Sequence, residues 1–174
     1  MPTRITLDRQ LQVSVVAAHN PVLLRAVRMW KDFEVLAFSN YFANFFINTL
    51  YRNTTQHEDL IFTTPPPHRQ SLRLRGHDIL GDVACKVARE FPRSSYRQIF
   101  RYEQERLRQR QVHYRDRKQN IRGSIQLVER AEGYIVLLDD VMTSGATLSE
   151  LSRVSRGHFD LEALVLTSAT ALTN

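Results

Sequence analysis

In Tyr134-Ile135-Val136-Leu137-Leu138-Asp139-Asp140-Val141-Met142-Thr143-Ser144-Gly145-Ala146-Thr147, an apolar run is followed by two acidic residues and a small, hydroxyl-rich turn. Residues 135–138 are uninterrupted aliphatics, which is typical of a central parallel strand covered on both faces. Such a strand delivers the residues after it to the carboxyl edge of the sheet. Unpaired carboxylates are costly to bury, so at least one of Asp139 and Asp140 is expected to face a ligand, a metal or water.

The turn after the acids predicts an anion site. It supplies hydroxyls, backbone N–H groups and one glycine just before a helical pattern at 148–154, the turn residues being Thr143, Ser144, Gly145, Ala146 and Thr147. Exposed N–H groups and the helix dipole favour a phosphate there, the dipole contributing roughly 0.3–1 kcal/mol. The turn is neither a P-loop nor a dinucleotide fingerprint, because it lacks the following lysine and the spaced glycines. Taken separately, the apolar run with its two acids also fits an ordinary strand end, and the Thr-Ser-Gly segment fits an ordinary turn. The order in which the two follow each other favours a sugar-phosphate site.

Composition fits one α/β domain of 174 residues, of which 43% are hydrophobic. The only cysteine, Cys85, excludes an internal disulfide and a multi-cysteine zinc site. No apolar run reaches about 18 residues, and the first ten residues do not read as a signal peptide. We therefore expect a cytoplasmic protein with no membrane association.

Basic charge is concentrated in one segment of the chain. The formal net charge is +6, and nearly all the basic residues are arginines. The segment 93–122 holds ten basic residues against three acidic ones. Arginine favours bidentate pairing with phosphates, so this basic arm could serve a phosphorylated substrate or a nucleic-acid backbone. A solvated surface arm is the alternative.

The remaining patterns predict an open, mostly parallel sheet flanked by helices. Helices are expected at 21–30, 35–51 and 78–91, and strands at 59–64 and 161–167. Residues 35–51 are rich in Phe and Tyr, which favours a core helix over a base-stacking surface. Three prolines after Thr64 end the first strand and lead into a loop that carries Arg69, Arg73 and Arg75.

The order of these motifs resembles that of the ComF-type, competence-associated phosphoribosyltransferases, a family with the type I phosphoribosyltransferase fold. The matching elements run from about Lys31 to Thr167, and the acidic turn is the specific part. A second set of residues precedes that turn, and its spacing is a moderately specific match: Gln109, Val112, Arg117, Asn120 and Gly123. Arg75-Gly76 is a weaker match. The chain departs from the family in lacking its paired-cysteine zinc ribbon and in having His77-Asp78 after Arg75-Gly76 where Phe-Asn is usual.

The resemblance implies a single domain at 1–174, with residues 1–55 as an N-terminal helical hood and 56–174 as a core that binds phosphoribosyl pyrophosphate (PRPP). Asp139 and Asp140 would be the catalytic pair and engage the ribose hydroxyls, while residues 143–147 would hold the 5′-phosphate. A flexible lid would include Gln109, Arg117 and Asn120. The pyrophosphate would lie against a loop whose expected residues are Thr64, Pro65, Pro66, Arg69 and Arg75.

The resemblance also implies Mg²⁺ as cofactor, bound through pyrophosphate oxygens and, through water, Asp139 and Asp140. The expected reaction transfers the phosphoribosyl group from PRPP to an acceptor and releases pyrophosphate. The acceptor is open, a nucleobase being one candidate, and so is a homo-oligomeric state. His68 and His77 flank the expected pyrophosphate loop, although isolated loop histidines are more often surface residues.

A second hypothesis is a non-catalytic accessory or regulatory protein that binds PRPP or single-stranded DNA, in line with the family's link to competence and DNA uptake. The basic arm and its aromatic residues could grip DNA by phosphate contacts and stacking, the aromatics being Tyr96, Phe100, Tyr102 and Tyr114. The enzyme needs the aspartate pair, whereas a DNA binder would depend on salt and not on those carboxylates.

Overall fold

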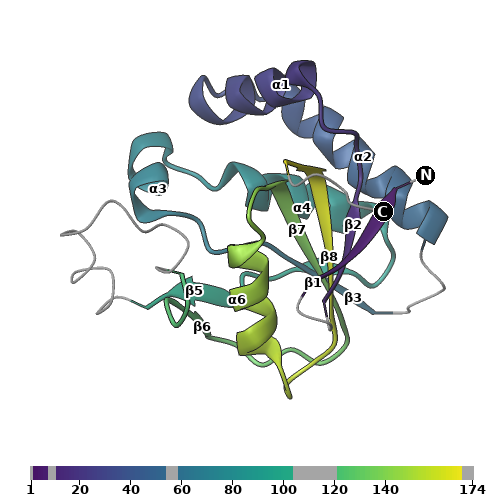
Figure 1. Cartoon of the computed structure of the whole chain (residues 1–174), viewed down its shortest axis with the longest axis vertical. Coiled ribbons are helices and arrows are strands. Elements are labelled where there is room, and N and C mark those ends of the chain that lie inside the picture. Colours follow the sequence, from purple (N-terminus) through teal and green to yellow (C-terminus); the bar gives the residue numbers. More distant parts are fainter. Residues whose placement is uncertain (1, 8–10, 54–58, 104–120, 170–174) are drawn as a thin grey trace.

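The computed structural model describes residues 2–7, 11–53, 59–103 and 121–169 (Figure 1). Its centre is a six-stranded sheet in the order β1-β2-β8-β7-β3-β4. The strands are Thr3–Leu7 (β1), Leu11–Val15 (β2), Leu60–Thr63 (β3), Ser95–Tyr96 (β4), Tyr134–Met142 (β7) and Leu161–Ser168 (β8). All neighbouring pairs are parallel except β1 and β2. The predicted α/β class with a mostly parallel sheet and flanking helices is confirmed.

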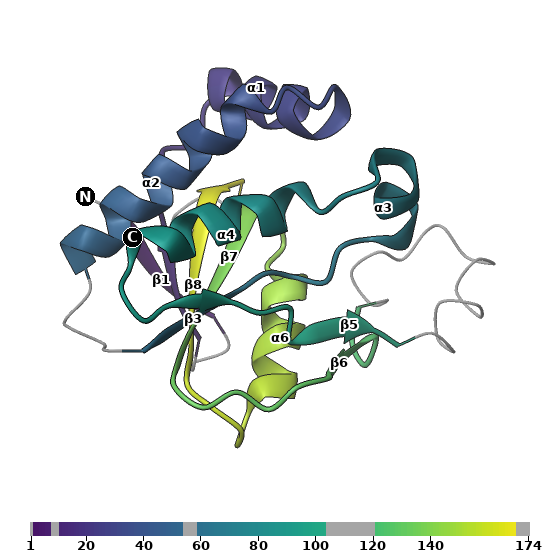
Figure 2. The same cartoon turned by 180° about the vertical axis from the view of Figure 1, so that it is seen from behind.

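Five helices are described, and three of them cover the faces of this sheet. They are Pro21–Asp32 (α1), Ala37–Asn53 (α2), Arg69–Arg75 (α3), Ile79–Glu90 (α4) and Ala146–Ser155 (α6). Helices α2 and α4 cover one face, while α6 and a small antiparallel sheet of Phe100–Tyr102 (β5) and Ile125–Leu127 (β6) cover the other (Figures 1 and 2). Helix α1 lies beyond the carboxyl ends of β7 and β8 (Figure 1).

The central strand β7 contributes to two hydrophobic cores, one on each face. Val136 and Leu138 pack with α1, α2 and α4, whereas Ile135 and Leu137 pack with α6, β2 and β5. All four side chains are at most 1% exposed. Because successive side chains of a strand point to opposite faces, the apolar run at 135–138 is explained by burial on both sides.

Helix boundaries follow from local chemistry. Asn20 accepts a hydrogen bond from the N–H of Leu23 (2.9 Å) and precedes Pro21, so α1 begins with a capping residue and a proline in the first turn. Asp78 accepts from the N–H of Leu80 (3.2 Å) and caps α4 in the same way. The expected helices and strands are thus found, with ends shifted by a few residues.

Three features differ from expectation. Strands β1 and β2 pair antiparallel at one side of the sheet, with β1 at its edge, so the N-terminal part is not wholly helical. Residues 69–75, expected in a loop, form α3, because His68 caps its start and Gly76 ends it with a left-handed φ of 77°. In α2, Phe42 and Phe46 are buried as predicted, whereas Tyr41 is 52% exposed. None of the helices in the described parts of the chain is both long and apolar enough to cross a membrane.

Candidate phosphate and sugar site

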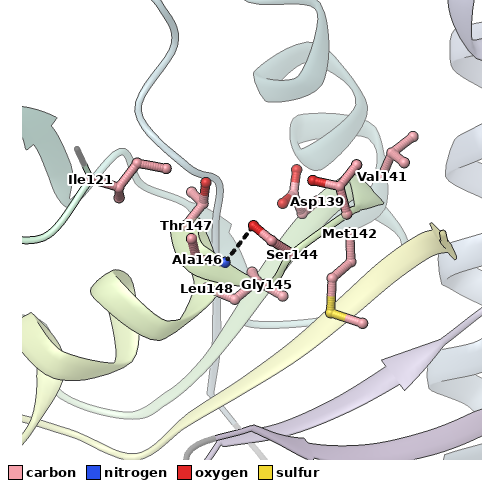
Figure 3. Close-up of a pocket in the computed structure, with 10 residues that line it drawn as sticks. Ile121, Asp139, Val141, Met142, Ser144, Gly145, Ala146, Thr147 and Leu148 are labelled. Atoms are coloured by element: carbon pink, nitrogen blue, oxygen red, sulfur yellow. Dashed lines mark hydrogen bonds between the residues drawn. The ribbon is translucent and has the colours of Figure 1, made fainter. Parts of the chain in front are cut away.

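The turn between β7 and α6 lines a cavity of about 510 Å³. Its walls come from the strand end, the turn and the first residues of α6, together with Ile121, and the residues are Asp139, Val141, Met142, Thr143, Ser144, Gly145, Ala146, Thr147 and Leu148. The side-chain oxygens of Asp139, Ser144 and Thr147 lie on one side of the turn, while Met142 points away from them (Figure 3). All five predicted phosphate-turn residues therefore share a cavity with Asp139.

Gly145 gives this turn its shape. It adopts a left-handed φ of 71° and stands at the N-cap of α6, a conformation that glycine adopts without steric cost. A Cβ atom at this position would lie 3.3 Å from a Leu7 methyl carbon of the β1–β2 hairpin. Ser144 Oγ accepts a hydrogen bond from the N–H of Ala146 (3.4 Å). Gly145 supplies no side-chain cap to α6, and the N-terminus of this helix, where an anion is favoured, borders the cavity.

Asp139 faces this cavity in an unusual electrostatic environment. Burial, followed by the neighbouring Asp140 carboxylate, raises the pKa of Asp139 to about 8, while the ammonium of Lys31 opposes the shift. Its carboxylate accepts the backbone N–H of Asp140 (2.9 Å). A ligand that presents hydroxyl donors or develops positive charge would favour the ionised form.

Asp140 contacts helix α1 and not the cavity. It is 7% exposed, it is not among the residues that line the cavity, and it forms an ion pair with Lys31 in the last turn of α1. The prediction that at least one acid faces a ligand site fits Asp139. Lys31 was not predicted as a site residue, and its one sequence signal was its rarity in an arginine-dominated chain.

The expected pyrophosphate residues lie apart from this cavity's lining. Thr64 is fully buried; its hydroxyl accepts from Gln98 Nε2 (2.9 Å) and lies 3.2 Å from the Tyr96 hydroxyl. Pro65 is half-buried and Pro66 is buried. Arg69 and Arg75 are the first and last residues of α3. The backbone after β3 is therefore fixed by the buried Thr64 and its hydrogen bonds. Arg69 and Arg75 project from a short helix and not from a loop.

The small sheet brings an unpredicted contact to the site. Burial, followed by the charge of Asp139, raises the pKa of Tyr102 on β5, and the Tyr102 ring meets the ring of His68 edge-on, with centroids 6.2 Å apart. His68 also caps α3 by accepting the N–H of Gln70 (3.3 Å). His77 contacts the Arg75 carbonyl oxygen (3.0 Å). The expected lid residues Gln109, Arg117 and Asn120 lie outside the described residues.

The donors available for Mg²⁺ are the two carboxylates at the end of β7. Within the described parts of the chain, no group of three or more His, Cys, Asp or Glu side chains could hold a metal ion. Mg²⁺ commonly uses one or two carboxylates together with water and substrate phosphates. Asp139, with Asp140 beside it, fits that kind of site, in which the ligand supplies most of the oxygens.

Comparison with known proteins adds no identification: no protein-family model matches the sequence, and no curated protein matches it.

Proposed function

We propose that this protein is a phosphoribosyltransferase that binds PRPP and transfers its phosphoribosyl group to an acceptor, with release of pyrophosphate. The observation that carries the proposal is the cavity at the carboxyl end of β7, where a carboxylate stands beside a turn of small and hydroxyl-bearing residues at a helix N-terminus. This pairing matches a sugar that bears both hydroxyls and a phosphate. The ComF-type motif order in the sequence supports the same assignment.

In the proposed reaction, the C1–oxygen bond to pyrophosphate breaks while the acceptor forms a bond to C1. Positive charge develops on the sugar and negative charge on the leaving group, so catalysis requires positioning and electrostatic support. Asp139 would take ribose hydroxyls and stabilise the sugar's charge, while residues 143–147 would hold the 5′-phosphate. Mg²⁺, when bound with PRPP, would neutralise the pyrophosphate. Arg69 and Arg75 would act on the same side from α3.

The proposal is tested by calorimetric titration of PRPP with Mg²⁺ into the purified protein and its Asp139→Asn variant, since the acceptor need not be known. We expect saturable binding by the wild type and a loss of about 10-fold or more in the variant, the scale of one charged hydrogen bond. Asp160→Asn is the matched control, because Asp160 is exposed and outside the cavity. No PRPP binding by the wild type would refute the proposal.

One observation favours the second candidate, a protein that binds single-stranded nucleic acid. Arg122, Arg153 and Arg156, together with Glu150, line a neighbouring cavity of about 350 Å³ that shares Ile121 and Ala146 with the first. Arginines at that density could track a phosphate backbone. Salt-sensitive binding of an oligonucleotide, unchanged by Asp139→Asn and without PRPP affinity, would support this candidate over the enzyme.

A further inference from the structure

The two adjacent aspartates at the end of β7 face different surroundings. From Ile135 to Leu138, β7 alternates between the core under α6 and the core under α1, α2 and α4. Beyond these residues, Asp139 lines the cavity, whereas Asp140 forms an ion pair with Lys31. Asp140 is buried, so it requires a charged or hydrogen-bonding partner to be stable as a carboxylate.

The partner is presented by a rigid part of the hood helices, by which we mean α1 and α2. Trp30, next to Lys31, is 1% exposed, and its indole N–H donates to Ser39 Oγ (2.8 Å). Its ring packs edge-on against Phe42 of α2, with centroids 5.1 Å apart. These contacts fix the end of α1, so Lys31 reaches Asp140 from an ordered helix end.

Other charged residues near the end of α1 are directed to solvent. Arg28, Asp32 and Glu34 are exposed, whereas Lys31 is only half exposed. Lys31 therefore differs from these neighbouring charged residues in that it pairs with a buried carboxylate. Because Asp140 follows the cavity-lining Asp139 directly in the chain, the Lys31–Asp140 ion pair stands at the border of the cavity.

We infer that the two aspartates have separate roles: Asp139 alone is the ligand-facing carboxylate, and Asp140 anchors the hood helices over the site through Lys31. Lys31 is thus a positioning residue that holds α1 above the carboxyl edge of the sheet. The assignment of Asp139 to a sugar rests on the proposed function, whereas the anchor does not.

The anchor is tested by fluorescence of Trp30, the only tryptophan of the chain. We expect Lys31→Met to raise the acrylamide quenching constant by about two-fold or more, because loosening of α1 exposes the indole. Lys31→Arg should keep the wild-type value, and so should the control Arg28→Met on the exposed side of α1. Asp139→Asn should also leave it unchanged. Unchanged quenching in Lys31→Met, or equal increases in Lys31→Met and Asp139→Asn, would overturn the inference.

PRPP titration tests the separation of roles. Lys31→Met should keep PRPP affinity within about three-fold, whereas Asp139→Asn should lose about 10-fold or more. Asp140→Asn should resemble Lys31→Met in the quenching measurement, and Lys31→Met carries the test if Asp140→Asn does not fold. Equal losses in Lys31→Met and Asp139→Asn would overturn the separation. Failure of the wild type to bind PRPP would refute the proposed function, while the quenching result would still decide the anchor.

Discussion

Gly145 is constrained by its backbone and by a neighbour, and the two constraints can be separated by mutation. At Gly145 an alanine would be strained by the left-handed φ and would also contact Leu7, whereas Gly157 has a similar φ of 79° and open space around it. Strain of this kind costs about 1–2 kcal/mol. We expect Gly157→Ala to lower stability by that amount, and Gly145→Ala to lower it further and weaken PRPP binding.

Chemical denaturation and PRPP titration of both variants check this prediction. Equal stability losses with unchanged PRPP affinity in Gly145→Ala would show that the turn tolerates a side chain and does not approach the ligand closely.

Glu150 on α6 fixes the chain that leads into β6. It is 3% exposed and accepts hydrogen bonds from the N–H of Gly123 and from Arg153, whose Nε lies 2.8 Å away. Burial would raise the pKa of Glu150, but the hydrogen bonds from Arg153 and Gly123 outweigh it and lower the pKa below 4.5. Because the Arg153 side chain is 43% exposed, solvent screens part of this interaction.

We therefore expect Glu150→Gln to lower the free energy of unfolding by about 1–2 kcal/mol at pH 7. A group with a lowered folded pKa stabilises above its ordinary pKa and loses that contribution as the pH falls through the folded value. The difference from wild type should thus be full near neutrality and shrink below about pH 4.5. Urea titrations across pH measure it, with the exposed Glu132→Gln as control; a difference that grows in acid would contradict the assignment.

At the scale of the element, α4 supports the segment after β3 through a close packing contact. An added Cβ at Gly81 would lie 2.7 Å from Asp78 Oδ2 and 2.8 Å from the Tyr96 hydroxyl. Tyr96 donates to Asp78 (3.5 Å) and contacts Thr64, the residue that opens the expected pyrophosphate loop. Because Gly81 has no side chain, Asp78, Tyr96 and Thr64 can approach one another and link α4 and β4 to this loop.

Gly81→Ala should therefore destabilise the protein by about 1–3 kcal/mol through overpacking, although alanine in a helix interior normally gains about 1 kcal/mol over glycine. Thermal unfolding checks the sign, and Lys86→Ala in the same helix is the control. An increase in melting temperature for Gly81→Ala would show that Asp78 and Tyr96 can move apart at little cost.

The elements predicted from the sequence were those with long or strongly apolar patterns. The helix at 78–91 and the strand run at 135–138 were recognised because their patterns repeat over several residues. The antiparallel pair β1 and β2 was missed, although Ile5 and Leu7, and Leu11 and Val13, alternate with polar residues. Helix α3 was missed because the preceding prolines and its arginines suggested a loop.

The candidate site was predictable only where its residues are neighbours in sequence. Asp139 and the turn at 143–147 lie in one stretch, and the structure brings them into one cavity. Lys31 and Tyr102 approach the acids through tertiary packing of α1 and β5, which local patterns do not encode. Strand alternation predicts that neighbouring side chains differ in their surroundings, but the sequence alone does not say which of Asp139 and Asp140 meets the cavity.

At the scale of the whole molecule, the two hydrophobic cores share the central strands, so we expect them to unfold together. Leu137 and Leu138 are both 0% exposed and belong to different cores. Truncating either to alanine should cost about 2–5 kcal/mol. Strand β7 pairs with both β3 and β8 and contributes side chains to both cores. Loss of packing in one core therefore loosens the strands on which the other core packs.

Urea unfolding followed by Trp30 fluorescence and by far-ultraviolet circular dichroism measures this coupling, since Trp30 reports only the core beneath the hood helices. The two transitions should coincide in the wild type, as expected for a two-state domain. Leu137→Ala removes side-chain volume from the core that does not contain Trp30. In this variant, the midpoint of the Trp30 transition should shift to lower urea by as much as the midpoint of the dichroism transition. A Trp30 transition that stayed at its wild-type midpoint would mean that the hood side is an independently stable unit.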